Sequence, residues 1–220
     1  MSVPRVKYPR TPHLPWSPGM TSEDRVMSRV GMDALSASPL VMTEKMDGGN
    51  VTLMRDSFYA RSLDSGTPRW EKFAKAEWAR IAHDIPDGWR VSAESLWARR
   101  SVPYEGLDSP VLVFGMWSKT SLLSWDDTQE WAAILGLSTV PVLGSPDSLD
   151  SAYSLWLSQR DERSSEGFVV RDSREFPAEQ FPLRVAKWVR AGHVRTSAAW
   201  RYQSTFPTNG FKTKDTANGC

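Results

Sequence analysis

The sequence lacks the residues that several classes of protein require. Only one cysteine occurs in 220 residues, and it is the last residue, Cys220. An intrachain disulfide and a cysteine-rich zinc site are therefore excluded, and a reducing, cytoplasmic location is expected. The three histidines are far apart and show no metal-ligand spacing. No charged-then-apolar N-terminal segment and no bilayer-length apolar run occurs, so no membrane partner is expected.

A strong net charge is also missing. The chain has 27 Lys and Arg residues against 26 Asp and Glu residues, which leaves a formal charge of +1. Binding of nucleic acid would therefore need a local basic patch. Hydrophobic residues make up 40% of the chain and charged residues 24%, as is typical of a globular domain with a core. The length predicts one domain, with at most a small appendage.

The order of the expected elements indicates the fold class. Residues 1–20 are rich in proline and basic residues and predict an extended arm. We expect helices at 21–37 (capped by Thr21 or Ser22), 68–84, 126–136, 147–160 and 193–204. We expect extended runs at 40–56, 57–63, 89–98, 110–118, 166–172 and 182–190. Residues 206–220 predict a disordered tail. Strands interrupted by helices without regular alternation indicate an α+β fold with mixed or antiparallel sheets flanked by helices.

Charged residues lie inside several of the strand-like runs, where burial without a partner is costly. They are Glu44, Lys45, Asp47, Arg61, Glu94, Glu166, Arg184 and Lys187. Convergence on one pocket would satisfy all of them, because carboxylates suit a hard metal ion and Lys and Arg suit phosphate oxygens. A lysine crowded by other cations would have a lowered pKa and could act as a nucleophile. The sequence therefore predicts a pocket for a phosphorylated ligand and a divalent cation.

Plainer interpretations exist for each of these residues. The stretch VMTEKMDGGNVTLMRD (41–56) could be a hairpin with a solvated lysine before an Asp-Gly-Gly turn. Glu94 could be an outward-facing polar residue, and Phe114 could belong to the core. Arg61, Glu166 and Lys187 could be surface charges at strand edges or ends.

Five segments decide between these interpretations. They are TEKMDGGNV (43–51) followed by YARS (59–62), SAESLW (92–97), VLVFGMW (111–117), SEGFVVRD (165–172) and RVAKWVR (184–190). In this order they resemble the motifs of the covalent nucleotidyltransferases, which include ATP-dependent RNA and DNA ligases and mRNA capping enzymes. The likeness is closest to the RNA ligases and runs from about residue 40 to about residue 200. Each segment alone is a weak signal, whereas the ordered set is specific.

The resemblance implies a role for each site residue. Lys45, in the Lys-x-Asp-Gly signature, would attack ATP and become a lysyl-AMP. Gly48 would let the backbone pass close to the ligand. The nucleotide would be bound by Glu44 near the adenine edge, Phe114 stacked on the base, Glu94 at the ribose hydroxyls, and Arg61 and Lys187 at the phosphates. Glu166 and Asp47 would bind Mg²⁺ or Mn²⁺. Lys187 would also be catalytic, by stabilising charge on the α-phosphate and by keeping Lys45 unprotonated.

The fifth motif departs from the pattern of the superfamily, which commonly has two lysines there. Here Lys187 is the only lysine, with Arg184 and Arg190 outside it. Whether either arginine replaces the second cation is left open by the sequence.

The resemblance implies an α+β nucleotidyltransferase (adenylation) domain over residues 21–205, of the ATP-grasp-like ligase type. About 30 residues follow Arg190, too few for an OB-fold, so none is expected. The implied activity is that of an ATP-dependent RNA ligase, which joins 5′-phosphate and 3′-hydroxyl ends through an adenylated 5′ end. A helper domain for end recognition is then absent or supplied by another chain. Nucleic-acid contacts are expected from the arm and other basic residues, namely Arg5, Lys7, Arg10, Arg99, Arg100, Arg190 and Arg195.

Two alternatives remain from the sequence. The same pocket could serve a DNA ligase or another AMP transferase. The chain could also be a nucleotide-binding or nucleic-acid-binding module that does not ligate, although a pure binder does not need a lysine nucleophile.

Overall fold

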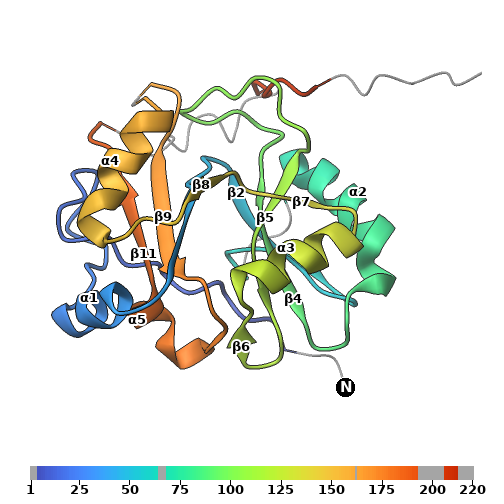
Figure 1. Ribbon diagram of the computed structural model, residues 1–220. Helices are drawn as coiled ribbons and strands as arrows, with labels where there is room; N and C mark the ends of the chain where they lie inside the picture. Colours follow the sequence, from blue (N-terminus) through green and yellow to red (C-terminus); the bar gives the residue numbers. More distant parts are fainter. Residues whose placement is uncertain (1–3, 64–67, 162, 193–205, 213–220) are drawn as a thin grey trace, which may run out of the picture.

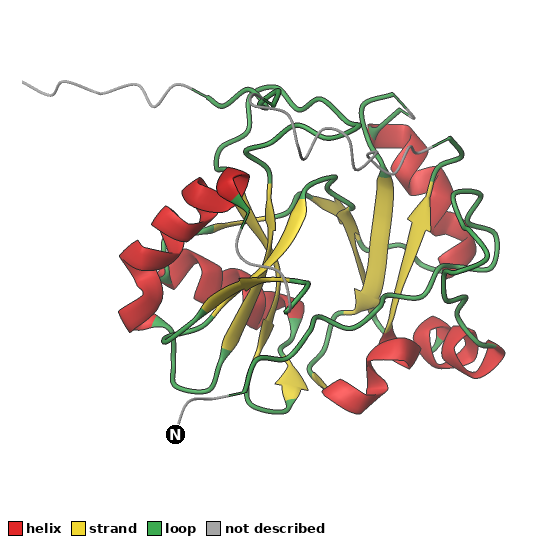
Figure 2. Ribbon diagram, turned by 180° about the vertical axis from the view of Figure 1, so that it is seen from behind, coloured by secondary structure: helices red, strands yellow, loops and turns green. Residues whose placement is uncertain are grey.

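Two β-sheets lie side by side at the centre of the computed structural model, with helices on their outer sides (Figures 1 and 2). The structure describes residues 4–63, 68–161, 163–192 and 206–212. The first sheet has the strand order β11-β9-β1-β8, and all of its pairs are antiparallel. Its strands are β1 (Leu40–Glu44), β8 (Val142–Gly144), β9 (Gly167–Asp172) and β11 (Val185–Val189).

The second sheet is larger and has the order β10-β6-β5-β4-β2-β3. Its strands are β2 (Gly49–Leu53), β3 (Phe58–Ala60), β4 (Arg90–Ser95), β5 (Val111–Trp117), β6 (Ser121–Leu122) and β10 (Phe176–Pro177). A short strand, β7 (Ser138–Thr139), pairs parallel with β5, so this sheet is mixed. The expected α+β class with mixed and antiparallel sheets is therefore confirmed.

The helices cover the sheets in two groups. Near the first sheet lie α1 (Arg29–Ser36), α4 (Leu149–Gln159) and the short α5 (Phe181–Arg184), and near the second lie α2 (Lys72–Ile81) and α3 (Trp125–Ile134) (Figure 1). Short 3₁₀ turns lie at Arg69–Glu71, Ala82–Asp84 and Ala178–Gln180. Ser124 and Ser148 cap α3 and α4, because their side chains accept hydrogen bonds from backbone N–H groups. Serine is a favoured residue at this position of a helix. The helices expected near 68–84, 126–136 and 147–160 are confirmed.

The first expected helix begins later than its sequence pattern predicts. Helix α1 starts at Arg29 with Ser28 as its N-cap, and neither Thr21 nor Ser22 caps it. The Asp24 carboxylate instead accepts hydrogen bonds from the backbone N–H and the hydroxyl of Thr21, at 3.1 and 3.0 Å. Such local side-chain bonds compete with helix formation, which explains why residues 21–24 form a turn instead.

The expected extended run 40–56 is two strands that belong to different sheets. Strand β1 lies in the first sheet and β2 in the second, so they do not pair with each other. The hairpin interpretation of this stretch is therefore wrong. The expected strand 182–190 is shorter than predicted, because Phe181–Arg184 form a helical turn before β11 begins.

Each sheet has an apolar cluster of its own, and two further clusters join residues of both sheets. The first sheet packs Met42, Phe168 and Trp188 against Leu35 and Trp156 of its helices. The second packs a separate cluster, with Val51, Leu53 and Val91 against Ala74 and Ile81 of α2. No helix in the described residues is long and apolar enough to cross a membrane.

The N-terminal arm is packed against the first sheet. His13 and Leu14 lie alongside β11. Leu14 N–H donates to Lys187 O at 2.8 Å, and Lys187 N–H donates to Pro12 O at 2.9 Å. The expected tail is also partly packed, because residues 206–212 lie against the segment that follows β4. The expected helix at 193–204 and residues 213–220 lie outside the described residues.

Candidate nucleotide-binding site

A cavity of about 1290 Å³ lies between the two sheets. All nine residues that the sequence predicts for a nucleotide site line it, and they come from both sheets: Glu44, Lys45, Asp47, Gly48, Arg61, Glu94, Phe114, Glu166 and Lys187. Lys45 to Gly48 form the connection from β1 to β2, so they cross from one sheet to the other at this cavity. A cavity of this kind is large enough for a nucleotide.

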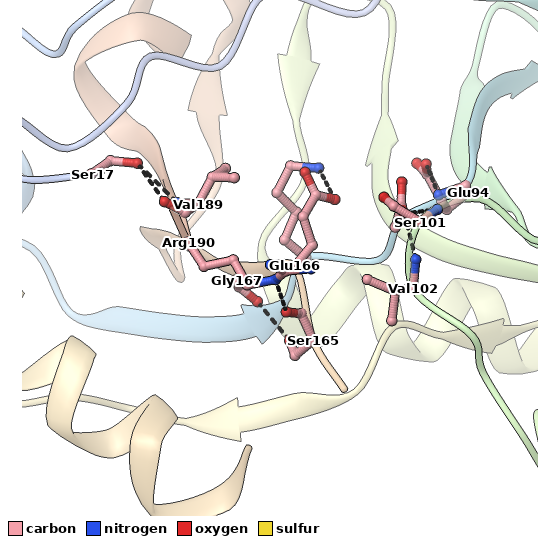
Figure 3. Close-up of polar contacts among 12 residues, drawn as sticks. Ser17, Glu94, Ser101, Val102, Ser165, Glu166, Gly167, Val189 and Arg190 are labelled. Atoms are coloured by element: carbon pink, nitrogen blue, oxygen red, sulfur yellow. Dashed lines mark hydrogen bonds and ion pairs between the residues drawn. The ribbon is translucent and has the colours of Figure 1, made fainter. Parts of the chain in front are cut away.

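Lys45 makes a short ion pair at the cavity. Its Nζ lies 2.6 Å from Glu166 Oε2, and the two side chains are 25% and 6% exposed. The backbone supports this contact, because Lys45 N–H donates to Gly167 O at 3.0 Å. Figure 3 shows Glu166 between Ser101 and Val102 on one side and Val189 and Arg190 on the other.

The carboxylates around Lys45 favour its charged form. Burial alone lowers the pKa of Lys45, but the carboxylates of Glu166, Glu94 and Asp47 outweigh burial and raise it above the usual value of a lysine. Lys45 is therefore an ammonium ion in the site without ligand. The expectation that Lys187 helps to keep Lys45 unprotonated stays a prediction, and in the site without ligand the nearby carboxylates favour the ammonium form of Lys45.

Lys187 is the lysine whose ammonium form is disfavoured. It lies at the centre of β11, opposite Val169 of β9. Burial and then the charge of Lys45 lower the pKa of Lys187 to about 8, although Asp24 and Glu166 oppose this shift. At neutral pH Lys187 still carries most of its positive charge, which suits a phosphate ligand.

Gly48 and Glu94 bring β2 and β4 into close contact at the cavity. Gly48 N–H donates to Glu94 Oε1 at 3.0 Å. A Cβ atom on Gly48 would lie 2.4 Å from Ser95 O, so a larger residue could not keep this backbone position. Burial raises the pKa of Glu94 to about 7, although Lys45 and Arg100 lower it. Glu94 therefore titrates near neutral pH in the site without ligand.

Asp47 is held by the segment that follows β4. Its Oδ2 accepts hydrogen bonds from Ser101 N at 2.8 Å, Ser101 Oγ at 2.5 Å and Val102 N at 3.0 Å. Its own N–H donates to Tyr104 Oη at 2.8 Å. The structure thus gives Asp47 a role in fixing the backbone beside Lys45, and its expected role as a metal ligand stays a prediction.

The remaining expected residues lie at the rim and floor of the cavity. Glu44 Oε2 pairs with Arg160 Nε at 2.9 Å. Phe114 meets Tyr8 of the arm edge-on, with ring centroids 5.0 Å apart. Arg61 is exposed at the end of β3, where its N–H donates to Asn50 O.

Neither arginine of the fifth motif lines the cavity. Arg184 Nη1 bonds to Asp172 and Ser38, and Arg190 Nε donates to Ser165 O at 3.1 Å. The cavity is lined instead by Arg171, on the β9 face that also carries Val169. Burial lowers the pKa of Arg171 to about 10. Strand alternation could have found Arg171, because it lies two residues from Val169, the residue opposite Lys187.

Other residues also line the cavity. Lys7 and Arg10 of the arm are among the basic residues that the sequence predicts for nucleic-acid contacts. Tyr8 and His13 of the arm, Asp24 of the following turn and Glu71 before α2 have no local signal in the sequence. The arm reaches the cavity only because it packs along β11, which is a long-range contact. Glu71 comes from the segment 68–84, for which the sequence predicts only a helix with one apolar face.

Comparisons with known proteins agree with this geometry. The model of the RNA ligase family matches residues 38–189. Similar solved structures include a protein from Aquifex aeolicus assigned as an ATP-dependent DNA ligase, with a TM-score of 0.58 and 18% identity over 84% of this chain and 50% of that chain. An archaeal ATP-dependent RNA ligase gives a TM-score of 0.55 and 15% identity, over 84% of this chain and 48% of that one.

A variant of Naegleria gruberi RNA ligase, solved with ATP and Mn, gives a TM-score of 0.52 and 13% identity over 86% of this chain and 62% of that chain. The chain thus spans about half to three fifths of the length of these structures. At such identities the likeness concerns the fold. No curated protein matches the chain.

Proposed function

The chain belongs to the RNA ligase family, and we propose that it is an ATP-dependent RNA ligase that joins 5′-phosphate and 3′-hydroxyl ends. The observation that carries this proposal is the position of Lys45, at the crossing between two sheets, within one cavity that also holds Glu94, Glu166 and Lys187. A binding module without chemistry would not require a lysine in such a place. The alternatives of a DNA ligase, another AMP transferase or a non-ligating module become outcomes of the experiment below.

ATP would lie across both sheets. Phe114 offers an aromatic face for adenine, and Glu94 offers carboxylate oxygens for the ribose hydroxyls. Glu44, paired with Arg160, would lie near the adenine edge. Arg61, Lys187 and the newly identified Arg171 would bind phosphate oxygens through charge-assisted hydrogen bonds.

In the first step, Lys45 Nζ loses a proton and attacks the α-phosphorus of ATP. A nitrogen–phosphorus bond forms, the bond to the β-phosphate oxygen breaks, and pyrophosphate leaves, which gives lysyl-AMP. The Lys45 proton must leave before the attack, and Glu166 Oε2, at 2.6 Å, is placed to take it. Lys187 would stabilise the negative charge that develops on the α-phosphate.

A divalent cation fits the chemistry of the cavity. The described residues contain no group of three or more His, Cys, Asp or Glu side chains arranged to hold a metal. Mg²⁺ commonly takes only one or two protein carboxylates, and phosphate and water oxygens complete its coordination. Glu166 would hold it, with Asp47 as the second predicted ligand. When bound, Mg²⁺ or Mn²⁺ would neutralise phosphate charge and orient the pyrophosphate.

The later steps use the same cavity. A 5′-phosphate oxygen of the RNA attacks the AMP phosphorus, the bond to Lys45 Nζ breaks, and an adenylated 5′ end forms. The 3′-hydroxyl then attacks the 5′-phosphate, a phosphodiester forms, and AMP leaves. The protein contributes mainly by holding the two ends close to each other. The basic residues Lys7 and Arg10, which line the cavity, are our candidates for contacts with RNA phosphates.

Several finer points belong to this proposal. Residues 21–205 would form the nucleotidyltransferase domain, of the ATP-grasp-like ligase type, with no OB-fold in this stretch. A helper domain or another chain would then recognise the RNA ends. The cysteine content favours a cytoplasmic location.

The test compares sealing of nicked duplex RNA, nicked duplex DNA and single-stranded RNA, each with a labelled 5′-phosphate. Wild-type protein with ATP and Mg²⁺ or Mn²⁺ is expected to seal RNA and to accumulate some adenylated 5′ ends, whereas Lys45→Ala should do neither. Sealing of DNA alone would contradict an RNA ligase in favour of a DNA ligase. Adenylated protein that transfers AMP to none of these ends would favour another AMP transferase. Wild-type protein that neither becomes adenylated nor seals any end would favour a non-ligating module.

A further inference from the structure

The backbone of Asp47 is fixed from both sides by the segment between β4 and β5. Its Oδ2 accepts three hydrogen bonds from Ser101 and Val102, and its N–H donates to Tyr104 Oη. Figure 3 shows Ser101 and Val102 beside Glu94. Burial raises the pKa of Tyr104 well above the usual range, so its hydroxyl is neutral and can accept this N–H. Lys45 is two residues from Asp47, so the position of this segment limits the position of Lys45.

The segment between β4 and β5 is in turn held by residues 207–212. Asn209 is only 5% exposed and uses both ends of its side chain. Its Oδ1 accepts from Tyr104 N at 3.0 Å, and its Nδ2 donates to Leu96 O at 2.7 Å. Gly210 N–H donates to Tyr104 O at 2.9 Å. Both backbone groups of Tyr104 are therefore bonded to residues 209–210.

Further contacts extend along the same segment. Arg99 N–H donates to Pro207 O, Leu107 N–H to Gly210 O, and Lys212 N–H to Leu107 O, at 2.9, 3.1 and 2.9 Å. The ring of Phe211 stacks on Trp97 with centroids 5.2 Å apart and an interplanar angle of 11°. None of residues 207–212 lines the cavity.

We infer that residues 207–212 are a positioning clasp for the catalytic lysine, acting through Tyr104 and Asp47. The order of contacts is Asn209 to Tyr104, Tyr104 to Asp47, and Asp47 to Lys45 by two backbone steps. Asn209 is a positioning residue, because it touches neither the cavity nor Lys45. The inference rests on the proposed function for its effect on rate, but the contacts themselves can be tested without chemistry.

The first test is the rate of lysyl-AMP formation by Asn209→Ala in a single turnover. We expect the rate at saturating ATP to fall at least about 10-fold, since small misplacement of a reacting group is costly, and KM for ATP to change less than about 2-fold. Thr208→Ala is the matched control, because Thr208 is exposed in the same segment. Equal rates for Asn209→Ala and wild type, at equal amounts of folded protein, would overturn the inference.

A double-mutant cycle separates positioning from a general loss of structure. Tyr104→Phe removes the acceptor of Asp47 N–H. If Asn209 acts through Tyr104, adding Asn209→Ala to Tyr104→Phe should slow adenylation by less than about 3-fold further, because the route is already broken. If the rate reduction in the double variant equals the product of the reductions in the two single variants, the two residues act independently. That result would contradict the route through Tyr104.

Amide hydrogen exchange gives a measurement that needs no enzymatic activity. In Asn209→Ala, we expect the amides of Asp47, Ser101 and Val102 to exchange at least about 10-fold faster than in Thr208→Ala, because their hydrogen bonds open more often. Unchanged exchange would overturn the clasp. If wild-type protein forms no lysyl-AMP, the proposed function fails, and these exchange rates alone decide whether the clasp exists.

Discussion

At the scale of single residues, the site without ligand holds Lys45, the proposed nucleophile, as an ammonium ion. Lys45 is paired with Glu166, and the pKa of Lys45 is raised by the surrounding carboxylates despite burial. A ligand that engages the carboxylate of Glu166 would remove much of this stabilisation of the charged form. The reactive amine would then appear only when the cavity is occupied, which limits side reactions of the free protein.

The first prediction concerns the titration of Lys45. Glu166→Gln should lower the pKa of Lys45, because the nearest negative charge that favours its ammonium form is removed. The measurement is NMR of isotope-labelled lysine, with Lys45→Arg used to assign the signal. Glu175→Gln, at an exposed position, is the control. A Lys45 pKa that is the same in Glu166→Gln and in wild type would contradict the assignment of this ion pair.

The second prediction concerns Glu71, which is 3% exposed and has one carboxylate oxygen without a hydrogen-bond partner in the described residues. Burial raises the pKa of Glu71 from 4.5 to about 7, although Ser95 and Arg100 lower it. A raised folded-state pKa contributes stability that is complete below pH 4.5 and is lost as pH rises through 7. Glu71→Gln does not lose this stability, because glutamine does not ionise. The free energy of unfolding of Glu71→Gln minus that of wild type should therefore rise by up to about 3 kcal/mol between pH 4.5 and pH 8.

Urea unfolding at both pH values measures this difference in the free energy of unfolding. Glu77→Gln, on the same helical segment but more exposed, should show a much smaller change with pH. If the stability difference between Glu71→Gln and wild type does not change with pH, Glu71 is ionised at an ordinary pKa and this account of it is wrong.

At the scale of elements, the sequence predicts strand and helix segments better than it predicts their partners. The run 40–56 is extended, as its apolar pattern indicates, but the pattern cannot show that β1 and β2 join different sheets. That division follows from long-range pairing of β1 with β9 and of β2 with β4. Helix α1 was predicted to begin too early because the bond from Thr21 to Asp24 competes with a helical turn.

The residues of the candidate site could be predicted from the sequence where they belong to a recognisable motif. All nine expected residues meet at one cavity, because each lies at a strand end or on the strand face that lines the cavity. Tyr8, His13 and Asp24 have no such local signal, because packing of the arm along β11 brings them there. Their roles at the cavity, and those of the nine, await measurement.

The third prediction concerns the crossing from β1 to β2. Gly48→Ala should reduce lysyl-AMP formation by at least about 10-fold and destabilise the fold by about 1–3 kcal/mol, because a Cβ would press on Ser95 O. The control for thermal unfolding is Gly210→Ala, where the nearest atom to a Cβ would be 3.5 Å away. Rate and thermal unfolding should both be measured. Wild-type values for Gly48→Ala would show that the close contact of β2 and β4 is not required.

At the scale of the whole molecule, two sheets enclose a cavity, and residues of the N-terminal arm line part of it. The arm is fixed to β11 through buried polar contacts. Ser17 Oγ accepts from Val189 N at 2.9 Å and lies 2.8 Å from His13 Nδ1. The arm therefore supports the strand that carries Lys187, and its contribution can be measured as stability.

The fourth prediction is that Ser17→Ala lowers the free energy of unfolding by about 1–3 kcal/mol, because the buried Val189 N–H loses its partner. Thermal or urea unfolding measures the change. Ser22→Ala, in the exposed turn that follows the arm, should change stability by less than about 0.5 kcal/mol. Equal effects of the two substitutions would mean that the arm is not fixed to β11 in solution.

The central claim is that Lys45 is the nucleophile that takes AMP from ATP. The most direct measurement incubates purified protein with α-labelled ATP and Mg²⁺ or Mn²⁺ and then separates it on a denaturing gel. We predict label on wild type and on Lys75→Ala, an exposed-lysine control, and none on Lys45→Ala. Intact-mass spectrometry should show an added AMP on any wild-type protein that was adenylated before purification. Wild-type protein with neither label nor added AMP, or label that persists in Lys45→Ala, would contradict the account.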